Sequence, residues 1–79
     1  MRLDKYLKVS RLIKRRAVAN EACDAGRVTV NGKPARASYE VKTGDVLEIS
    51  MGAHPIRAEI ISISEVVRKE DAGLMYKLL

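Results

Sequence analysis

Hydrophobic positions recur at helical spacing near the start of the chain. When residues 2–8 are wound as a helix at about 100° per residue, one arc of roughly that width collects the apolar side chains Leu3, Tyr6 and Leu7. A contiguous arc on the other side carries Arg2, Lys5 and Lys8. We therefore predict an amphipathic helix with one packing face and one cationic face.

A second helix is predicted from Arg16 to Ala25, with Gly26 as its C-cap. Its expected buried stripe consists of small residues, namely Val18, Ala22 and Ala25, with Ala19 and Cys23 beside them. Its expected outer face carries Asn20, Glu21 and Asp24. Small buried side chains allow close packing on a neighbouring helix or sheet.

Alternating patterns replace helical ones from residue 27 onward. Residues 27–30 read as a strand, and the Asn31-Gly32 pair after it is a strong tight-turn signal. Residues 33–35 are expected to continue this turn into an irregular stretch. Further strands are predicted over residues 46–51 and from residue 56 to 63.

The tail, residues 66–79, is ambiguous, because residues 69–77 could form a short helix that Gly73 weakens. Two helices followed by a small, mostly antiparallel sheet define an α+β fold. With 79 residues there is room for one core only, so we predict a single domain over residues 1–79.

Composition narrows the function classes. The chain has no Trp or Phe and one cysteine, which predicts an aliphatic core, no internal disulfide and a reducing, cytoplasmic setting. No apolar run exceeds three residues, so no membrane association is expected. A domain this small rarely encloses an enzyme's active-site pocket within its own walls, so we do not expect an enzyme.

The net charge of +5 is unevenly distributed. Residues 1–16 carry a charge of +6, with Asp4 as their only acid, whereas residues 17–79 sum to −1. The chain is therefore a near-neutral domain with a basic head, and a basic head predicts a polyanionic partner.

Residues 14–16 concentrate three of these cations at the start of the second predicted helix. Cations at a helix N-terminus oppose the helix dipole, and each costs about 0.3–1 kcal/mol. The other end is reversed too, since Glu21 and Asp24 lie near the C-terminus. Such local conflicts mark functional sites, and a helix N-terminus offers free N–H groups to a phosphate. We interpret residues 14–16 as a phosphate-binding corner.

Catalytic and metal-binding patterns are missing from the sequence. His54 is the only histidine and Cys23 the only cysteine, 31 positions apart, which cannot make a metal site. No phosphate-binding glycine loop, nucleophilic triad or acid–base pair is present. We therefore expect no catalytic residue, no metal and no cofactor.

The order of short motifs resembles a known family. The segments are Arg2-Leu3-Asp4, Lys14-Arg15-Arg16-Ala17 and the run Gly26-Arg27-Val28-Thr29-Val30-Asn31-Gly32-Lys33, with Lys42-Thr43-Gly44-Asp45 further on. Together they resemble the S-four-type RNA-binding domain, whose helix–helix–strand motif would cover residues 1–33 and whose remaining sheet would cover residues 34–79. One departure is that Arg15 stands where many members have a capping Ser or Thr.

The resemblance implies an RNA-binding surface for structured ribosomal or transfer RNA. It assigns Arg2, Arg15 and Arg16 to that surface. The charge distribution adds Lys8, Arg11 and Lys14, and the residues that flank the first strand, Arg27 and Lys33, are weaker candidates.

The whole chain resembles small stand-alone members of the family, most closely the bacterial ribosome-associated quality control P proteins and then the fifteen-kilodalton heat-shock proteins. The opening residues 1–16 and residues 69–76 carry this likeness. It implies a factor that binds rRNA and tRNA on the large subunit, and we expect this factor to be a monomer off the ribosome. There it would hold a stalled peptidyl-tRNA while a partner factor directs alanine tailing.

Two other classes remain open. A helix-turn-helix DNA-binding protein would use the second helix for reading bases, but acids on its outer face, Glu21 and Asp24, would repel a groove. A protein-interaction module would need an apolar patch, which residues 74–76 could supply. Salt dependence of RNA binding separates these classes from the RNA-binding one.

Overall fold

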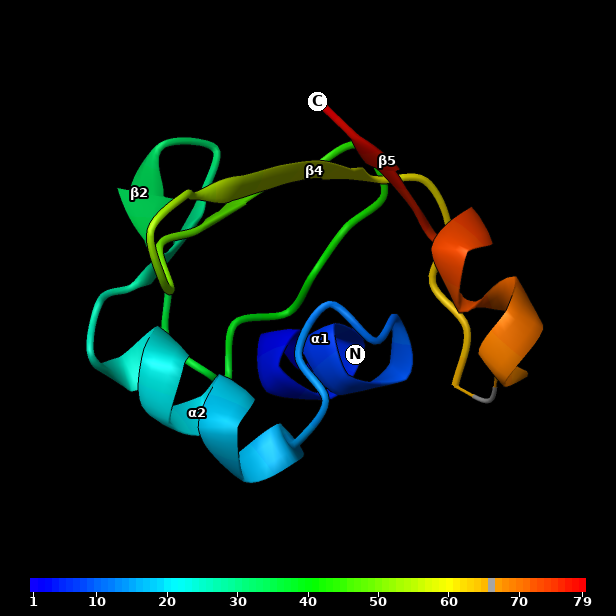
Figure 1. The fold of residues 1–79 in the computed structure, drawn as a ribbon, viewed down its shortest axis with the longest axis horizontal. Coiled ribbons are helices and arrows are strands. Elements are labelled where there is room, and N and C mark those ends of the chain that lie inside the picture. Colours follow the sequence, from blue (N-terminus) through cyan, green and yellow to red (C-terminus); the bar gives the residue numbers. More distant parts are fainter. Residues whose placement is uncertain (66) are drawn as a thin grey trace.

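The computed structural model describes residues 1–65 and 67–79 and has two layers. Helices α1 (Leu3–Val9) and α2 (Arg16–Asp24) lie on one side of a five-stranded sheet (Figure 1). The strands are β1 (Val28–Val30), β2 (Lys33–Pro34), β3 (Val46–Ile49), β4 (Ile56–Ile60) and β5 (Tyr76–Leu78), and a 3₁₀ helix, η1 (Lys69–Leu74), precedes β5. The sheet order is β2-β1-β3-β4-β5, and each pair of neighbours is antiparallel. The predicted α+β class is confirmed.

The turn between β1 and β2 follows directly from the Asn-Gly pair. Asn31 and Gly32 have φ values of 53° and 85°, and positive φ at both central residues is the mark of a type I′ hairpin turn. Such a turn returns the chain alongside β1, so that Val30 pairs with Lys33 and Thr29 with Pro34. The prediction of an irregular stretch at residues 33–35 was therefore wrong at its first two residues, which form β2.

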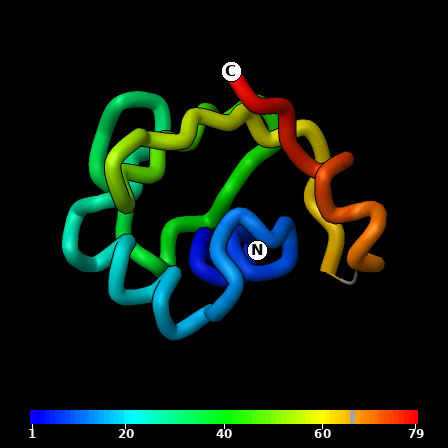
Figure 2. Tube along the Cα trace, in the orientation of Figure 1, coloured from blue at the N-terminus to red at the C-terminus, as the bar shows by residue number. Residues whose placement is uncertain are grey.

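The C-terminal part differs more from the prediction. The strand expected to reach residue 63 ends at Ile60, because the N–H groups of both Ile61 and Ser62 donate to the Met75 carbonyl and bend the chain away. The helix expected over residues 69–77 is a 3₁₀ helix as far as Leu74 and a strand from Tyr76. Figure 2 shows the chain leaving the sheet after β4 and returning to it as β5. Val66, which begins the ambiguous tail, lies outside the described residues.

The core fills the space between the helices and the sheet. In α2, Ala19, Ala22 and Cys23 are buried as predicted, whereas Ala25 is exposed because the helix ends at Asp24 and Ala25 is its C-cap. Burial raises the pKa of the Cys23 thiol to about 11, as the nearby acids also do, so this cysteine is a core residue and not a reactive thiolate. The largest fully buried core side chains come from α1 and the strands and include Tyr6, Leu3, Leu7, Leu47, Ile49, Ile60, Met75 and Val28.

A buried carboxylate, Asp45, ties the β1–β2 turn to the connection before β3. It accepts hydrogen bonds from Asn31 Nδ2 at 3.1 Å, Tyr39 Oη at 3.0 Å and the Lys42 N–H at 3.0 Å. The Asn31 Oδ1 in turn accepts the Val46 N–H at 2.9 Å. The Asn-Gly and Gly-Asp motifs of the sequence are thus two halves of one structural clamp.

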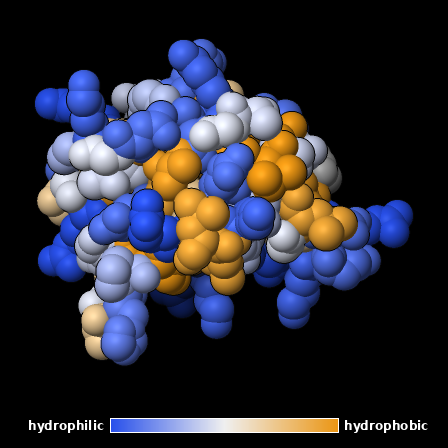
Figure 3. Space-filling view, turned by 90° about the horizontal axis from the view of Figure 1, so that it is seen from above, coloured by the Kyte–Doolittle hydropathy of each residue, from blue (hydrophilic) through white to orange (hydrophobic). Residues whose placement is uncertain are grey.

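The face of the sheet that points away from the helices carries both hydrophobic and hydrophilic side chains. Seen from above the sheet, hydrophobic side chains gather between hydrophilic ones (Figure 3). Most of the exposed large hydrophobic residues come from the C-terminal part of the chain, namely Ile61, Leu74, Leu78 and Leu79, with Ile56 on β4. No helix within residues 1–65 and 67–79 has the length and hydropathy to cross a membrane.

Candidate nucleic-acid interface

The segment between α1 and α2 gathers cations beside α1. After α1 ends, Arg11 adopts a left-handed backbone conformation with φ of 63°, and the Ile13 N–H donates to the Leu7 carbonyl at 3.1 Å. This sharp reversal and the buried Ile13 side chain return the chain along α1 toward its N-terminal turn, where α2 begins. A helix of seven residues is only about 10 Å long. The basic head is therefore compact.

The buried carboxylate of Asp4 organises this head. Its Oδ1 accepts hydrogen bonds from Arg2 Nε at 3.2 Å and from the Lys5 N–H at 2.8 Å. Its Oδ2 accepts from Arg16 Nε at 3.4 Å, Asn20 Nδ2 at 3.2 Å and Arg2 Nη2 at 3.4 Å. Asp4 thus joins the first turn of α1 to two turns of α2.

The exposure of these side chains shows which way the group faces. The Asp4 side chain is 3% exposed, whereas those of Arg2 and Arg16 are 51% and 48% exposed. Each arginine uses part of its guanidinium on Asp4 and keeps further N–H groups toward solvent. The carboxylate therefore orients two cations outward at a fixed separation.

The protonation state of Asp4 supports this arrangement. Burial by itself raises the pKa of the carboxyl, but hydrogen bonds from Asn20, Arg16 and the Lys5 N–H outweigh it and hold the pKa of Asp4 below its usual value. Asp4 is therefore charged at neutral pH, and it cancels only part of the charge of the two arginines that it holds.

Helix α2 is charged against its dipole, as predicted. Its N-cap, Arg15, makes no side-chain capping hydrogen bond, its first turn has no acid and its last turn has no base. The N–H groups of the first turn receive no hydrogen bond from the N-cap side chain, and Arg15 and Arg16 stand beside them. An anion bound there would relieve both the dipole conflict and the repulsion between the cations.

The other cations of the head are more loosely held. Lys5 pairs with Glu65 from the connection after β4. Lys8 and Arg11 line a shallow cavity of about 200 Å³ together with that glutamate. Within the described part of the chain, no ion pair is formed by the exposed cations Lys8, Arg11, Lys14 and Arg15.

Two of the predicted residues lie elsewhere. Arg27 follows the C-terminal end of α2, about 13 Å along the helix from Arg16. Lys33 belongs to β2, at the edge of the sheet. The structure brings Arg2 and Arg16 together on Asp4 and places Lys8 and Arg11 beside Glu65, whereas Arg27 and Lys33 lie elsewhere.

Sequence reasoning missed the residues that position the arginines. Asn20 was predicted to face outward, but it is half-buried and donates to Asp4. Asp24 is exposed as predicted, yet its Oδ1 accepts the Ala37 N–H at 3.1 Å. The one available signal was that Asp4 is the single acid among seven bases in residues 1–16.

Metal chemistry finds no support among residues 1–65 and 67–79. They contain no cluster of three or more His, Cys, Asp or Glu side chains able to hold an ion. His54 is exposed, in the connection between β3 and β4. The candidate interface is built from cations, two of which are held by the Asp4 carboxylate.

Comparison with known proteins agrees with this geometry. A family model of the S4 domain matches residues 1–47. The chain is 54% identical to the RQC P-site tRNA stabilizing factor of Halalkalibacterium halodurans, over 99% of this chain and 89% of that protein. It is 47% identical to the factor of that name from Bacillus subtilis, over 100% and 92% of the two chains.

Among solved structures, the chain is similar to the trimeric structure of Vibrio cholerae heat shock protein 15. The TM-score is 0.93 and the identity 30%, covering 100% of this chain and 81% of that one. The match spans the helix pair, the sheet and the C-terminal element alike. The chain belongs to the S4 domain family and, within it, to the family of the RQC P-site tRNA stabilizing factors.

Proposed function

We propose that the chain is a non-enzymatic RNA-binding factor that contacts rRNA and tRNA on the large ribosomal subunit. The observation that carries the proposal is the group around Asp4, which holds two half-exposed arginines beside the uncapped start of α2. Guanidinium groups fixed in this way suit phosphate oxygens, which accept paired N–H donors. The phosphate-contacting residues of the proposal are Arg2, Lys8, Arg11, Lys14, Arg15 and Arg16.

The RNA is proposed to be structured, because the cations lie on a rigid, folded surface and not on an extended tail. Double-stranded RNA is recognised largely by shape and through its backbone. Arg27 and Lys33 would then meet RNA only through a second contact, away from the head.

The family relationship supports a place for this contact in translation. The relatives are named for stabilising a tRNA in the ribosomal P site during ribosome-associated quality control. We propose the same task for this chain: in the cytoplasm it holds the peptidyl-tRNA of a stalled nascent chain while a partner factor directs alanine tailing. Off the ribosome it is proposed to be a monomer that requires no cofactor.

Crosslinking in cells tests the proposal. The tagged protein is crosslinked to RNA and purified, and the recovered RNA is sequenced, for the wild type and for the double variant Arg15→Gln with Arg16→Gln. Arg57→Gln is the matched control, because Arg57 lies on β4, 58% exposed, and pairs with Glu48 at 3.6 Å.

The wild type and the control should recover large-subunit rRNA and tRNA, and the double variant at least about tenfold less, since two phosphate contacts are lost. Recovery of mRNA alone, or equal recovery by all three proteins, would contradict the proposal.

A further inference from the structure

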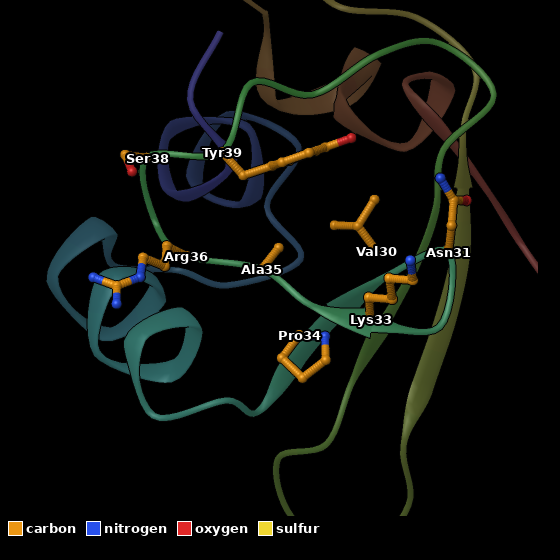
Figure 4. Close-up of a pocket in the computed structure, with 8 residues that line it drawn as sticks. All are labelled: Val30, Asn31, Lys33, Pro34, Ala35, Arg36, Ser38 and Tyr39. Atoms are coloured by element: carbon orange, nitrogen blue, oxygen red, sulfur yellow. The ribbon is translucent and has the colours of Figure 1, made fainter.

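A cavity of about 740 Å³ opens beside the β1–β2 hairpin, away from the cations of the α1–α2 connection. Its walls come from β1, β2 and the segment that follows, residues 35–39 (Figure 4). The residues that matter for the argument are Val30, Lys33, Pro34, Ala35, Arg36 and Tyr39. We call this cavity the Tyr39 pocket.

The pocket has an apolar floor and one aromatic wall. Val30 and Ala35 project toward the ring of Tyr39, which lies across the pocket, and Pro34 lines it from β2 (Figure 4). Tyr39 is half-buried, and its hydroxyl donates to Asp45 Oδ2 at 3.0 Å. Because the hydrogen bond to Asp45 holds the hydroxyl, the ring is fixed in place. Part of the ring remains accessible to a ligand.

Two cations border this apolar surface. Lys33 extends its amine on the side of Tyr39, and the Arg36 side chain extends toward α2 (Figure 4). Both residues are exposed, and neither takes part in an ion pair within residues 1–65 and 67–79. The nearby carboxylate of Asp45 is buried and already accepts three hydrogen bonds. The pocket therefore combines a flat stacking surface with positive charge at its border.

The pocket is also rigidly connected to the group around Asp4. The Leu3 N–H donates to the Tyr39 carbonyl at 2.7 Å, and the Asp4 N–H donates to the Ala37 carbonyl at 3.2 Å. The Ala37 N–H donates to Asp24 on α2 at 3.1 Å. The segment that carries Arg36 and Tyr39 is thus fastened to both helices of the proposed RNA interface.

We propose that the Tyr39 pocket receives one unstacked nucleotide of the bound RNA, with its base against Tyr39 and its phosphate beside Lys33, while Arg36 on the opposite side meets the neighbouring backbone. This inference rests on the proposed function and adds a contact to it. Bases that leave a helix are commonly bound by stacking on aromatic side chains, with cations on the backbone. The proposal also gives Lys33, which the fold separates from the helices, a role of its own.

The test uses two RNA hairpins that differ by one nucleotide. One is fully paired, and the other carries a single unpaired 2-aminopurine, whose fluorescence falls when it stacks. The variants are Tyr39→Leu, which removes the ring, and Tyr39→Phe as the matched control, which keeps the ring but loses the same hydrogen bond to Asp45. Lys33→Gln with Arg36→Gln forms a second test that changes only exposed side chains.

Binding should quench the 2-aminopurine in the wild type and in Tyr39→Phe but not in Tyr39→Leu. Affinity for the hairpin with the unpaired base should fall about tenfold in Tyr39→Leu, which is within the range of base–aromatic stacking. The double variant should bind the hairpin with the unpaired base several-fold more weakly than the wild type does. Affinity for the fully paired hairpin should be unchanged in Tyr39→Leu.

The opposite results separate two failures. The pocket inference is wrong, while the proposed function stands, if binding of the wild type does not quench the 2-aminopurine. The same holds if Tyr39→Leu and the double variant quench it as the wild type does. If Arg16→Gln also leaves both hairpins tightly bound, the proposed function itself fails. Micromolar binding of free adenosine 5′-monophosphate without any quenching of the hairpin would make the pocket a free-nucleotide site and overturn the inference.

Discussion

Two buried carboxylates, Asp4 and Asp45, have opposite surroundings in this small domain. Each is less than one-tenth exposed, and each accepts several hydrogen bonds. The donors to Asp45 are an amide, a phenol and a backbone N–H, all of them neutral. The donors to Asp4 include two guanidinium groups that remain about half exposed.

This difference separates a structural role from a positioning role. Around Asp45 the donors are neutral groups of the hairpin and of the connection before β3, so the clamp serves the two segments that it joins. Around Asp4 the donors are shared with solvent, so the carboxylate sets where two cations stand without neutralising both. The same residue type thus stabilises the fold in one place and orients the arginines of the proposed phosphate-binding surface in the other.

The largest expected effect is on stability, from Asp45→Ala. This change leaves the Asn31 amide, the Tyr39 hydroxyl and the Lys42 N–H without their acceptor, which costs about 3 kcal/mol or more of unfolding free energy. That is a large share of the stability of a small domain. Urea denaturation followed by circular dichroism measures the loss.

Asp45→Asn keeps one acceptor oxygen and should cost less. Affinity for a fully paired RNA hairpin, corrected for the folded fraction, should not change in either variant. If Asp45→Ala retained full stability and lost RNA affinity, Asp45 would belong to the interface and the contrast with Asp4 would be wrong.

The next effect combines affinity and stability, in Asp4→Asn. The substitution raises the net charge from +5 by one, so a surface that acts by charge alone would bind RNA more tightly. We expect RNA affinity to fall about fivefold instead, because Arg2 and Arg16 lose the charged acceptor that orients them. Fluorescence anisotropy with a labelled RNA hairpin measures the change, and tighter binding would contradict the positioning role.

The pH dependence of stability checks the same variant. The pKa of Asp4 is lower in the folded state than in the unfolded chain, so its stabilisation is present above about pH 4 and is lost as the pH falls through the folded-state value. The difference in unfolding free energy between wild type and Asp4→Asn, about 1–2 kcal/mol at neutral pH, should therefore shrink in acid. A difference that stays constant down to pH 2 would show that the charge of Asp4 contributes nothing.

The smallest effect should come from Arg11→Gly. Arg11 has φ of 63°, a conformation that costs an L-residue about 1–2 kcal/mol and glycine almost nothing. Glycine also gives the unfolded chain more conformational entropy, which offsets part of this gain. We therefore expect a net increase in the unfolding free energy of about 0.5–1 kcal/mol. RNA affinity should fall a few-fold, because one exposed cation is lost. If the variant lost both stability and RNA affinity, the Arg11 side chain would contribute to the folded structure by packing. Arg11 would then no longer count among the phosphate-contacting residues.

The sequence predicted the parts of this fold that depend on local patterns. The two helices, the Asn31-Gly32 turn and the strands in the middle of the sheet follow from periodicity and turn chemistry. Strand β5 was missed because its three residues, Tyr76–Leu78, have no strand signal of their own. They become a strand only because the β4 edge is available to pair with them.

The candidate site was predictable to a similar extent. Charge alone located the basic head and the conflict at the start of α2. The joint role of Asp4, Arg16 and Asn20 was not visible, because residues 12 and 16 positions apart meet only when the two helices pack. The Tyr39 pocket was hidden for the same reason, since its walls depend on the β1–β2 hairpin and on the clamp at Asp45.

The salt dependence of RNA binding tests the central claim most directly. The measurement is the slope of log affinity against log salt for the wild type, Arg16→Gln and the control Arg57→Gln, on one fully paired RNA hairpin. If Arg16 contacts a phosphate from its position on Asp4, its loss should flatten the slope by about one unit and weaken binding, and the control should match the wild type. An Arg16→Gln variant with wild-type affinity and slope would contradict the account.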